Sequence, residues 1–217
     1  RASLLAGRGE FDAALAAYRR GLAIRAAVYG VQHPRYAFSL AQIGDVLTQQ
    51  GKYVEAAEYL EQALAIRTRA LGPDHPEVGD TLIGIGKIEF RRGRSEAALR
   101  ATQRALVVLS TALGPASLRV ASVKQNLAVM FREQKHLAQA LALDDEVLAQ
   151  LAKTLSPEHP RVLALRGNRA GVLSDLGRHA EAIAELRGLL ALREAAAARP
   201  AALAHTLLDQ IGRASCR

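Results

Sequence analysis

The chain has 217 residues, of which 50% are hydrophobic and 23% charged, so it is long enough for one or two globular domains. It contains 43 Ala and 33 Leu but only nine aromatic residues and no Trp. Ala and Leu favour helices, whereas strands favour β-branched and aromatic residues, so this composition argues against a β-sandwich, a β-barrel or a large mixed sheet. Every uncharged run is far shorter than the roughly 18–20 residues of a membrane-spanning helix, so we expect no transmembrane segment.

The charge and the cysteine content restrict the class of protein further. The single cysteine, Cys216, excludes an internal disulfide framework and a zinc site made of several thiolates, and it fits a reducing, cytoplasmic location. The net charge is +8, and the stretch from Lys87 to Lys135 holds ten basic and three acidic residues, so most of the excess lies there. A basic stretch of this kind points to an acidic partner or to nucleic acid.

An internal repeat of 42 residues organises the chain. His-Pro occurs at 33–34, 75–76 and 159–160, and the copy expected at 117–118 is replaced by Ser-Leu. Three further ladders keep the same step: Ala14, Ala56, Ala98, Ala140 and Ala182; Leu22, Leu64, Leu106, Leu148 and Leu190; Gly44, Gly86, Ala128, Ala170 and Gly212. Because three ladders share one register, the chain is a tandem array.

Each repeat predicts two amphipathic helices. In the stretch 34–71, Leu40, Ile43 and Leu47 form one apolar stripe, and Gly51 ends that helix. A second stripe follows at Ala56, Leu60, Ala63 and Leu64. Proline after each histidine suits the first helical position, where its missing N–H would be unpaired anyway. The recurring Gly and Ala predict close helix crossings, and a single helix pair cannot bury both stripes, so neighbouring repeats must stack.

The segment GKYVEAAEYLEQALAIRTRALGPDHPEV at 51–78 and its counterpart at 7–34 resemble the tetratricopeptide repeat, in the 42-residue form of kinesin light chains and many bacterial signalling proteins. The resemblance implies an all-α, right-handed superhelical solenoid of stacked antiparallel helix pairs over residues 1–213, with about five units and incomplete first and last copies. In this family helix A of each repeat starts at the His-Pro, and helix B follows the Gly-Lys/Arg-Tyr/Phe turn. The resemblance implies A helices at about 34–50, 76–92, 118–134 and 160–176, and B helices at about 10–29, 52–71, 94–113, 136–155 and 178–197, with partial helices at 1–7 and from 201. Residues 214–217 match no earlier copy, and we expect a tail there. The family further implies a recognition module of a larger bacterial signalling or regulatory protein.

The last two complete A helices depart from the family pattern. Lys124, Arg166 and Arg169 stand where the family has Leu, so these helices present charge where a partner helix should pack. The third His-Pro is also missing. Both departures bear on how regularly the array stacks.

The chemistry-bearing residues do not predict an enzyme. The repeated histidines lie one full repeat apart, too far to bind one zinc ion, so we interpret them as helix-start residues and expect no metal. Asp144, Asp145 and Glu146 point about 100° apart on a helix and indicate a solvated face. Phosphate-binding glycine motifs and nucleophile–base sets are missing, so we expect no catalytic residue and no cofactor.

A binding site is expected on the A helices, which in this family line the concave face. Projection at 100° per residue places a second stripe of side chains roughly opposite the packing stripe. It is rich in amides and charges, which can bind the carbonyls and carboxylates of an extended peptide. The candidate binding residues are Gln42, Asp45, Lys87, Arg91, Gln125, Asn126, Arg132 and Asn168. We therefore predict a protein or peptide partner of acidic character and no membrane partner. The sequence does not define the oligomeric state.

Two alternatives remain. Basic helical repeats can follow nucleic-acid phosphates, but only Phe90 and Phe131 could provide stacking in the basic stretch, and Arg94, Arg100 and Arg104 belong to a B helix. A receptor for a peptide signal or a small regulatory ligand would use the same groove as the predicted partner segment. The sequence does not separate that receptor from an interaction scaffold.

Overall fold

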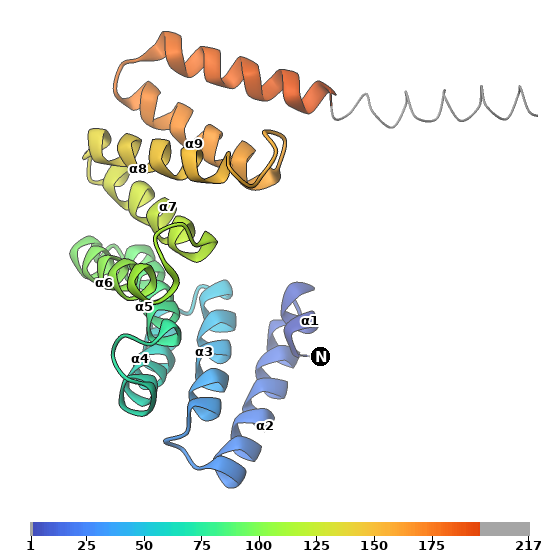
Figure 1. Cartoon of the computed structure of the whole chain (residues 1–217). Coiled ribbons are helices and arrows are strands. Elements are labelled where there is room, and N and C mark those ends of the chain that lie inside the picture. Colours follow the sequence, from blue (N-terminus) through green and yellow to red (C-terminus); the bar gives the residue numbers. More distant parts are fainter. Residues whose placement is uncertain (1, 196–217) are drawn as a thin grey trace, which may run out of the picture. The chain divides into compact units, whose positions relative to one another are not determined.

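The computed structural model describes residues 2–195, and these residues form helices joined by short turns (Figure 1). The helices are α1 (Ala2–Gly7), α2 (Phe11–Tyr29), α3 (Pro34–Gln49), α4 (Tyr53–Leu71), α5 (Pro76–Arg91), α6 (Ser95–Leu113), α7 (Leu118–Glu133), α8 (Leu137–Leu151) and α9 (Pro160–Asp175), followed by helical residues 179–195. No strand occurs in this part of the chain. The all-α prediction and nearly all predicted helix ends are confirmed, whereas the predicted helix from 201 and the tail at 214–217 lie outside the described residues.

The chain divides into two compact units, residues 1–134 and 135–217. The first unit contains α1–α7, in which each helix packs against the next, and successive A helices α3, α5 and α7 also touch. The second unit contains α8, α9 and the helix at 179–195. A single solenoid over 1–213 stays a prediction.

The histidines of the repeat cap helices. His33, His75 and His159 each accept a hydrogen bond at Nδ1 from the backbone N–H two residues later, at 3.1–3.2 Å. This bond satisfies one of the orphan donors of the first helical turn. In the third repeat Ser117 Oγ accepts the same bond from Arg119 at 3.2 Å, so the loss of His-Pro leaves the capping function intact.

A residue with positive φ, glycine in every described case but one, links each A helix to its B helix. Gly51 has φ +77°, and the bonds from Lys52 N–H to the Leu47 carbonyl (2.9 Å) and from Gly51 N–H to the Thr48 carbonyl (3.0 Å) close a Schellman turn. The same 42-residue step places Gly9, Gly93 and Gly177 in this conformation and puts Lys135 there as well, with φ +63°. Lys135 is the one described non-glycine residue with positive φ.

Helix α8 ends earlier than the repeat predicts. Gly72 follows α4 with φ 91° and ψ 155°, a conformation nearly restricted to glycine. The equivalent residue after α8 is Ser156, and α8 ends at Leu151 instead of the predicted 155. Because a side chain disfavours that backbone conformation, the chain leaves the helix one turn early.

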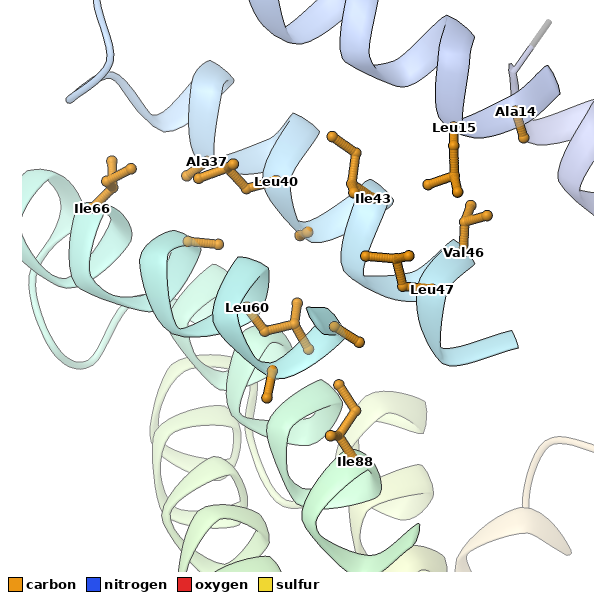
Figure 2. Packing of buried hydrophobic residues seen from close by; sticks show 14 residues of the cluster. Ala14, Leu15, Ala37, Leu40, Ile43, Val46, Leu47, Leu60, Ile66 and Ile88 are labelled. Atoms are coloured by element: carbon orange, nitrogen blue, oxygen red, sulfur yellow. The ribbon is translucent and has the colours of Figure 1, made fainter. Parts of the chain in front are cut away.

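The first unit is held together by the predicted apolar stripes. Leu40, Ile43 and Leu47 of α3 lie between α2 and α4 and are fully buried (Figure 2). The small-residue ladder reflects tight crossings: a Cβ on Gly44 would lie 3.0 Å from Leu60 Cγ. At Gly86 it would collide with Thr102 Oγ1 and lie 3.3 Å from the Ala98 carbonyl oxygen. The glycine therefore permits a helix approach that Ala would hinder.

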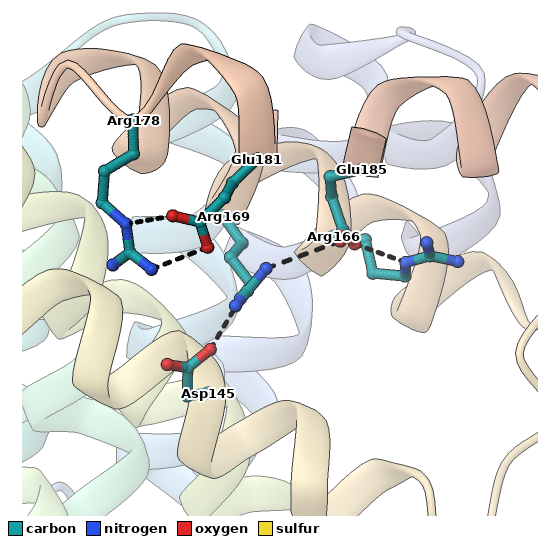
Figure 3. Close-up of polar contacts among 6 residues, drawn as sticks. All are labelled: Asp145, Arg166, Arg169, Arg178, Glu181 and Glu185. Carbon is teal, nitrogen blue, oxygen red and sulfur yellow. Dashed lines mark hydrogen bonds and ion pairs between the residues drawn. The ribbon is translucent and has the colours of Figure 1, made fainter. Parts of the chain in front are cut away.

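Charged residues replace leucine in the packing stripe, as the sequence indicated. Lys124 is only 8% exposed. Arg166 and Arg169 of α9 are bonded to carboxylates of neighbouring helices in the second unit (Figure 3). The sequence did not reveal a fourth case, Glu89, which occupies the register of Leu47, is 7% exposed and binds Arg92 at 2.7 Å. The expectation that Asp144 belongs to a solvated face was wrong, because this residue is only 2% exposed. No described helix is both long enough and apolar enough to cross a membrane.

Candidate peptide-binding groove

Three successive A helices of the first unit line one open hollow of about 360 Å³. A peptide segment crossing it would meet α3, α5 and α7 in turn. The lining residues are Thr48 from α3, Lys87, Phe90 and Arg91 from α5, and Asn126, Val129 and Met130 from α7. This composition combines two cations and an amide with an apolar floor.

The two cations of the hollow are available for a ligand. Lys87 and Arg91 are one helical turn apart on α5 and both are exposed. Within the described residues neither forms an ion pair. Their N–H groups can therefore bind a carboxylate without first breaking an ion pair.

Asp45 of α3 does not line the hollow but interacts electrostatically with Lys87, which does. Although Asp45 is exposed, partial desolvation by its surroundings raises the pKa of its carboxyl, while Lys87 and Arg67 act in the opposite direction. The result is a carboxyl group that accepts a proton more readily than an isolated aspartate. Asp45 therefore opposes the cations of the groove less as the pH falls through its raised pKa.

The remaining predicted residues are distributed over both units. Gln42 on α3 accepts a hydrogen bond at Oε1 from the Tyr18 hydroxyl at 2.9 Å, so one end of its amide is engaged. Gln125 and Arg132 on α7 are half-buried and do not line the hollow. Asn168 lies on α9 in the second unit and is exposed. Of the predicted set, the hollow brings together Lys87, Arg91 and Asn126.

The apolar lining was not predicted, although part of the signal was present. Thr48, Phe90 and Val129 fall in the same helical stripe as the polar candidates: Thr48 and Phe90 share one repeat position, and Val129 has the position of Asp45 and Lys87. The predicted site rests on amide and charged side chains, which bind peptide carbonyls and carboxylates, and it therefore does not include Thr48, Phe90 or Val129. Met130 lies outside that stripe, at the register of the buried Val46, and periodicity alone assigns it to the core.

Four of the ten basic residues of the stretch 87–135 lie in ion pairs within the protein. Arg92 and Arg94 both bind Glu89, at 2.7 and 3.5 Å. Arg100 binds Glu96 at 3.4 Å on α6, and Arg119 binds Asp80. These pairs place three carboxylates, of Glu89, Glu96 and Asp80, beside the positive charge that the sequence shows.

The described residues contain no group of three or more His, Cys, Asp or Glu side chains that could hold a metal ion. The repeated histidines act as helix caps, which agrees with their interpretation as helix-start residues.

Comparison with known proteins agrees with the repeat. A family profile described as "Tetratricopeptide repeat" matches residues 1–69, 41–110 and 112–195. No curated protein matches the chain.

Solved structures show the same fold at low sequence identity. A Podosopora anserina protein described as a kinesin light chain with nearly identical TPR-like repeats is 23% identical, with a TM-score of 0.75 over 88% of this chain and 91% of that one. BtubC (BKLC) from P. vanneervenii is 24% identical, with a TM-score of 0.79 over 89% and 77% of the two chains. The apo form of RapI is 15% identical, with a TM-score of 0.75 over 90% and 68%. With its 42-residue period, its antiparallel helix pairs and a profile match over most of its length, the chain belongs to the tetratricopeptide repeat family.

Proposed function

We propose that the chain binds an extended, acidic segment of a partner protein across α3, α5 and α7, as the recognition module of a larger signalling or regulatory protein. Tetratricopeptide repeats generally serve as protein–protein interaction scaffolds and are typically not enzymes. The observation that carries the proposal is the hollow in which Lys87, Arg91 and Asn126 surround an apolar floor.

The geometry suits an extended chain. Packed helices lie about 8–10 Å apart, so a segment that crosses three of them spans roughly 16–20 Å. At about 3.3 Å per residue this corresponds to five or six extended residues. Asn126 can bind backbone amides of such a segment, Lys87 and Arg91 can bind its carboxylates, and Phe90 with Val129 can receive an apolar side chain.

A nucleic-acid partner is the less favoured alternative. The internal ion pairs of Arg92, Arg94, Arg100 and Arg119 reduce the charge that phosphates would meet. A receptor for a free signalling peptide stays open, because such a peptide would use the same hollow.

The proposal is tested by selection from a random peptide library. The full chain is immobilised and panned against displayed peptides of about 12 residues, which exceed the span of the hollow. We expect enrichment of sequences with two or more acidic residues near an apolar one. Parallel selection on the double variant Lys87→Glu, Arg91→Glu should lose that enrichment. Enrichment without acidic residues, or the same acidic enrichment on both proteins, would contradict the proposal.

A further inference from the structure

The second unit contains a separate hollow of about 400 Å³ between α8, the turn that follows it, α9 and the helix at 179–195. It uses none of the groove residues of the first unit. Its lining is mixed: Asp145, Leu148, Ala152, Leu155, Pro157, Val162, Arg166, Arg169 and Glu185. A volume of this size falls in the range of small-molecule sites.

Several departures from the repeat meet at this hollow. Arg166 and Arg169 stand at the registers of Leu40 and Ile43, which are buried apolar residues in the first unit. Glu185 stands at the register of Tyr59 and Ala101, so α9 and the helix at 179–195 both carry a charged residue where earlier repeats have an uncharged one. The early end of α8 adds a longer turn on the same side, because Leu155 and Pro157 lie in it and line the hollow.

Glu185 links the two arginines and leaves part of Arg166 unused. Arg166 Nε lies 2.5 Å from Glu185 Oε1, and Arg169 Nη1 lies 3.5 Å from Glu185 Oε2 (Figure 3). Arg169 Nε also binds Asp145 Oδ1 at 2.6 Å. The two Nη groups of Arg166 lie on the side of the guanidinium away from Glu185, and within the described residues they have no hydrogen-bond partner.

Arg166 has room for this arrangement because of Gly188. A Cβ on Gly188 would lie 2.9 Å from Arg166 Nη2. The equivalent residues of earlier repeats are Gln62, Arg104 and Glu146, so the glycine is specific to this repeat. A guanidinium held through Nε, with its Nη edge unbonded, is preorganised for a bidentate contact with a carboxylate.

We propose that this hollow binds a small monocarboxylic acid with an apolar chain. The carboxylate occupies the Nη edge of Arg166, and the chain lies against Leu148, Leu155 and Val162. Glu185 does not repel the ligand strongly because its own charge is shared by both arginines. A purely structural role for Arg166 would require the ion pair with Glu185 alone and would give no preference for an acid over its amide.

The test uses hexanoate as the probe and hexanamide as its neutral counterpart. The isotopically labelled full chain is titrated with each compound, and the dissociation constant is obtained from amide chemical shifts in NMR spectra. We expect saturable shifts at the lining residues with hexanoate and an affinity at least about tenfold lower for hexanamide, as a charge-assisted contact implies. The variant Arg166→Gln should weaken hexanoate binding by about tenfold or more.

Two further variants protect the test from a folding defect. Arg178→Gln removes an arginine that binds Glu181 at 2.7 Å and does not line the hollow, and it should leave hexanoate affinity unchanged. Leu148→Phe keeps every charge and fills part of the hollow, and it should abolish binding. Equal affinity for acid and amide, full binding by Arg166→Gln, or no saturation with hexanoate would overturn the proposal. Binding of an acetylated tripeptide with a free C-terminal leucine, without binding of hexanoate, would overturn it too.

Discussion

At the scale of single residues, backbone conformation explains where this chain departs from its own repeat. Lys135 occupies a position that Gly9, Gly51, Gly93 and Gly177 fill elsewhere, with the same positive φ. Residues other than glycine pay a steric cost in this region, because Cβ approaches the following carbonyl oxygen. At such a turn the presence or absence of a Cβ therefore affects stability more than the polarity of the side chain does.

Replacing Lys135 by Gly should relieve that strain. We expect the free energy of unfolding to rise by about 0.5–1 kcal/mol, since the relief of about 1–2 kcal/mol is partly offset by the greater freedom of glycine in the unfolded chain. Chemical denaturation of the full chain measures the change. Lys135→Ala removes the same charge but keeps a Cβ, so it should not stabilise. If Ala and Gly stabilise equally, the lysine charge and not the backbone is responsible.

The contact between a B helix and the following A helix can be polar or apolar, as a buried arginine shows. Arg67 on α4 is 5% exposed and donates to Thr81 Oγ1 at 2.7 Å and to the Glu77 carbonyl at 3.2 Å. Desolvation lowers the pKa of Arg67 from its ordinary value, partly offset by Glu77. One repeat later the equivalent residues are Leu109 and Val123, both fully buried.

The double change Arg67→Leu, Thr81→Val copies that later junction. We expect Thr81→Val alone to lower the free energy of unfolding by about 1–3 kcal/mol, because a buried guanidinium loses a partner. The double variant should recover most of this loss, since a well-packed apolar pair can replace a buried polar one. A double-mutant cycle from urea unfolding measures the coupling. Additive losses would show that Arg67 and Thr81 do not depend on one another.

At the scale of helices, close crossings set the packing of the array. Ala98 on α6 is fully buried, and its carbonyl lies 3.3 Å from where a Cβ on Gly86 of α5 would stand. A larger residue at position 98 has no space to occupy. The conserved step of 42 residues in this ladder follows from that geometry.

Ala98→Leu should therefore destabilise the chain by about 1–3 kcal/mol through overpacking. Ala112→Leu makes the same chemical change at an exposed position of the same helix and should stay within about 0.5 kcal/mol of the parent. Thermal and urea denaturation of both variants provide the comparison. Equal tolerance at the two positions would show that the α5–α6 register is wrong.

Helix positions could be predicted from the sequence because five copies of the repeat show the same residue spacing. The ladders place α3 and α5 to within a residue, and Ser117 fills the capping role without matching the His-Pro motif. The predicted end of α8 was wrong because Ser156 stands where the earlier repeats have glycine, and a side chain disfavours the backbone conformation of that glycine. Periodicity reports the average repeat, and it does not register such local replacements.

At the scale of the whole molecule, the candidate groove was harder to predict than the fold. Periodicity identifies the stripe that contains Lys87 and Asn126, but it does not reveal that Tyr18 engages Gln42. The pairing of Arg166 with Glu185, which lie 19 residues apart in the sequence, depends on the contact between two helices. Side-chain partners of this kind follow from tertiary geometry, which one sequence does not supply.

The central claim is that the A-helix face of the first unit, and not the basic charge as such, binds the partner. The most direct measurement is the affinity of an acidic peptide, selected on the parent chain, for two charge-matched variants. Lys87→Glu with Arg91→Glu alters the hollow, whereas Arg100→Glu with Arg104→Glu alters exposed residues of α6 that do not line it. Loss of two charge-assisted contacts should weaken binding to the first variant by about a hundredfold or more and leave the second within about threefold of the parent. Equal weakening of both variants, or greater weakening of the α6 variant, would contradict the account.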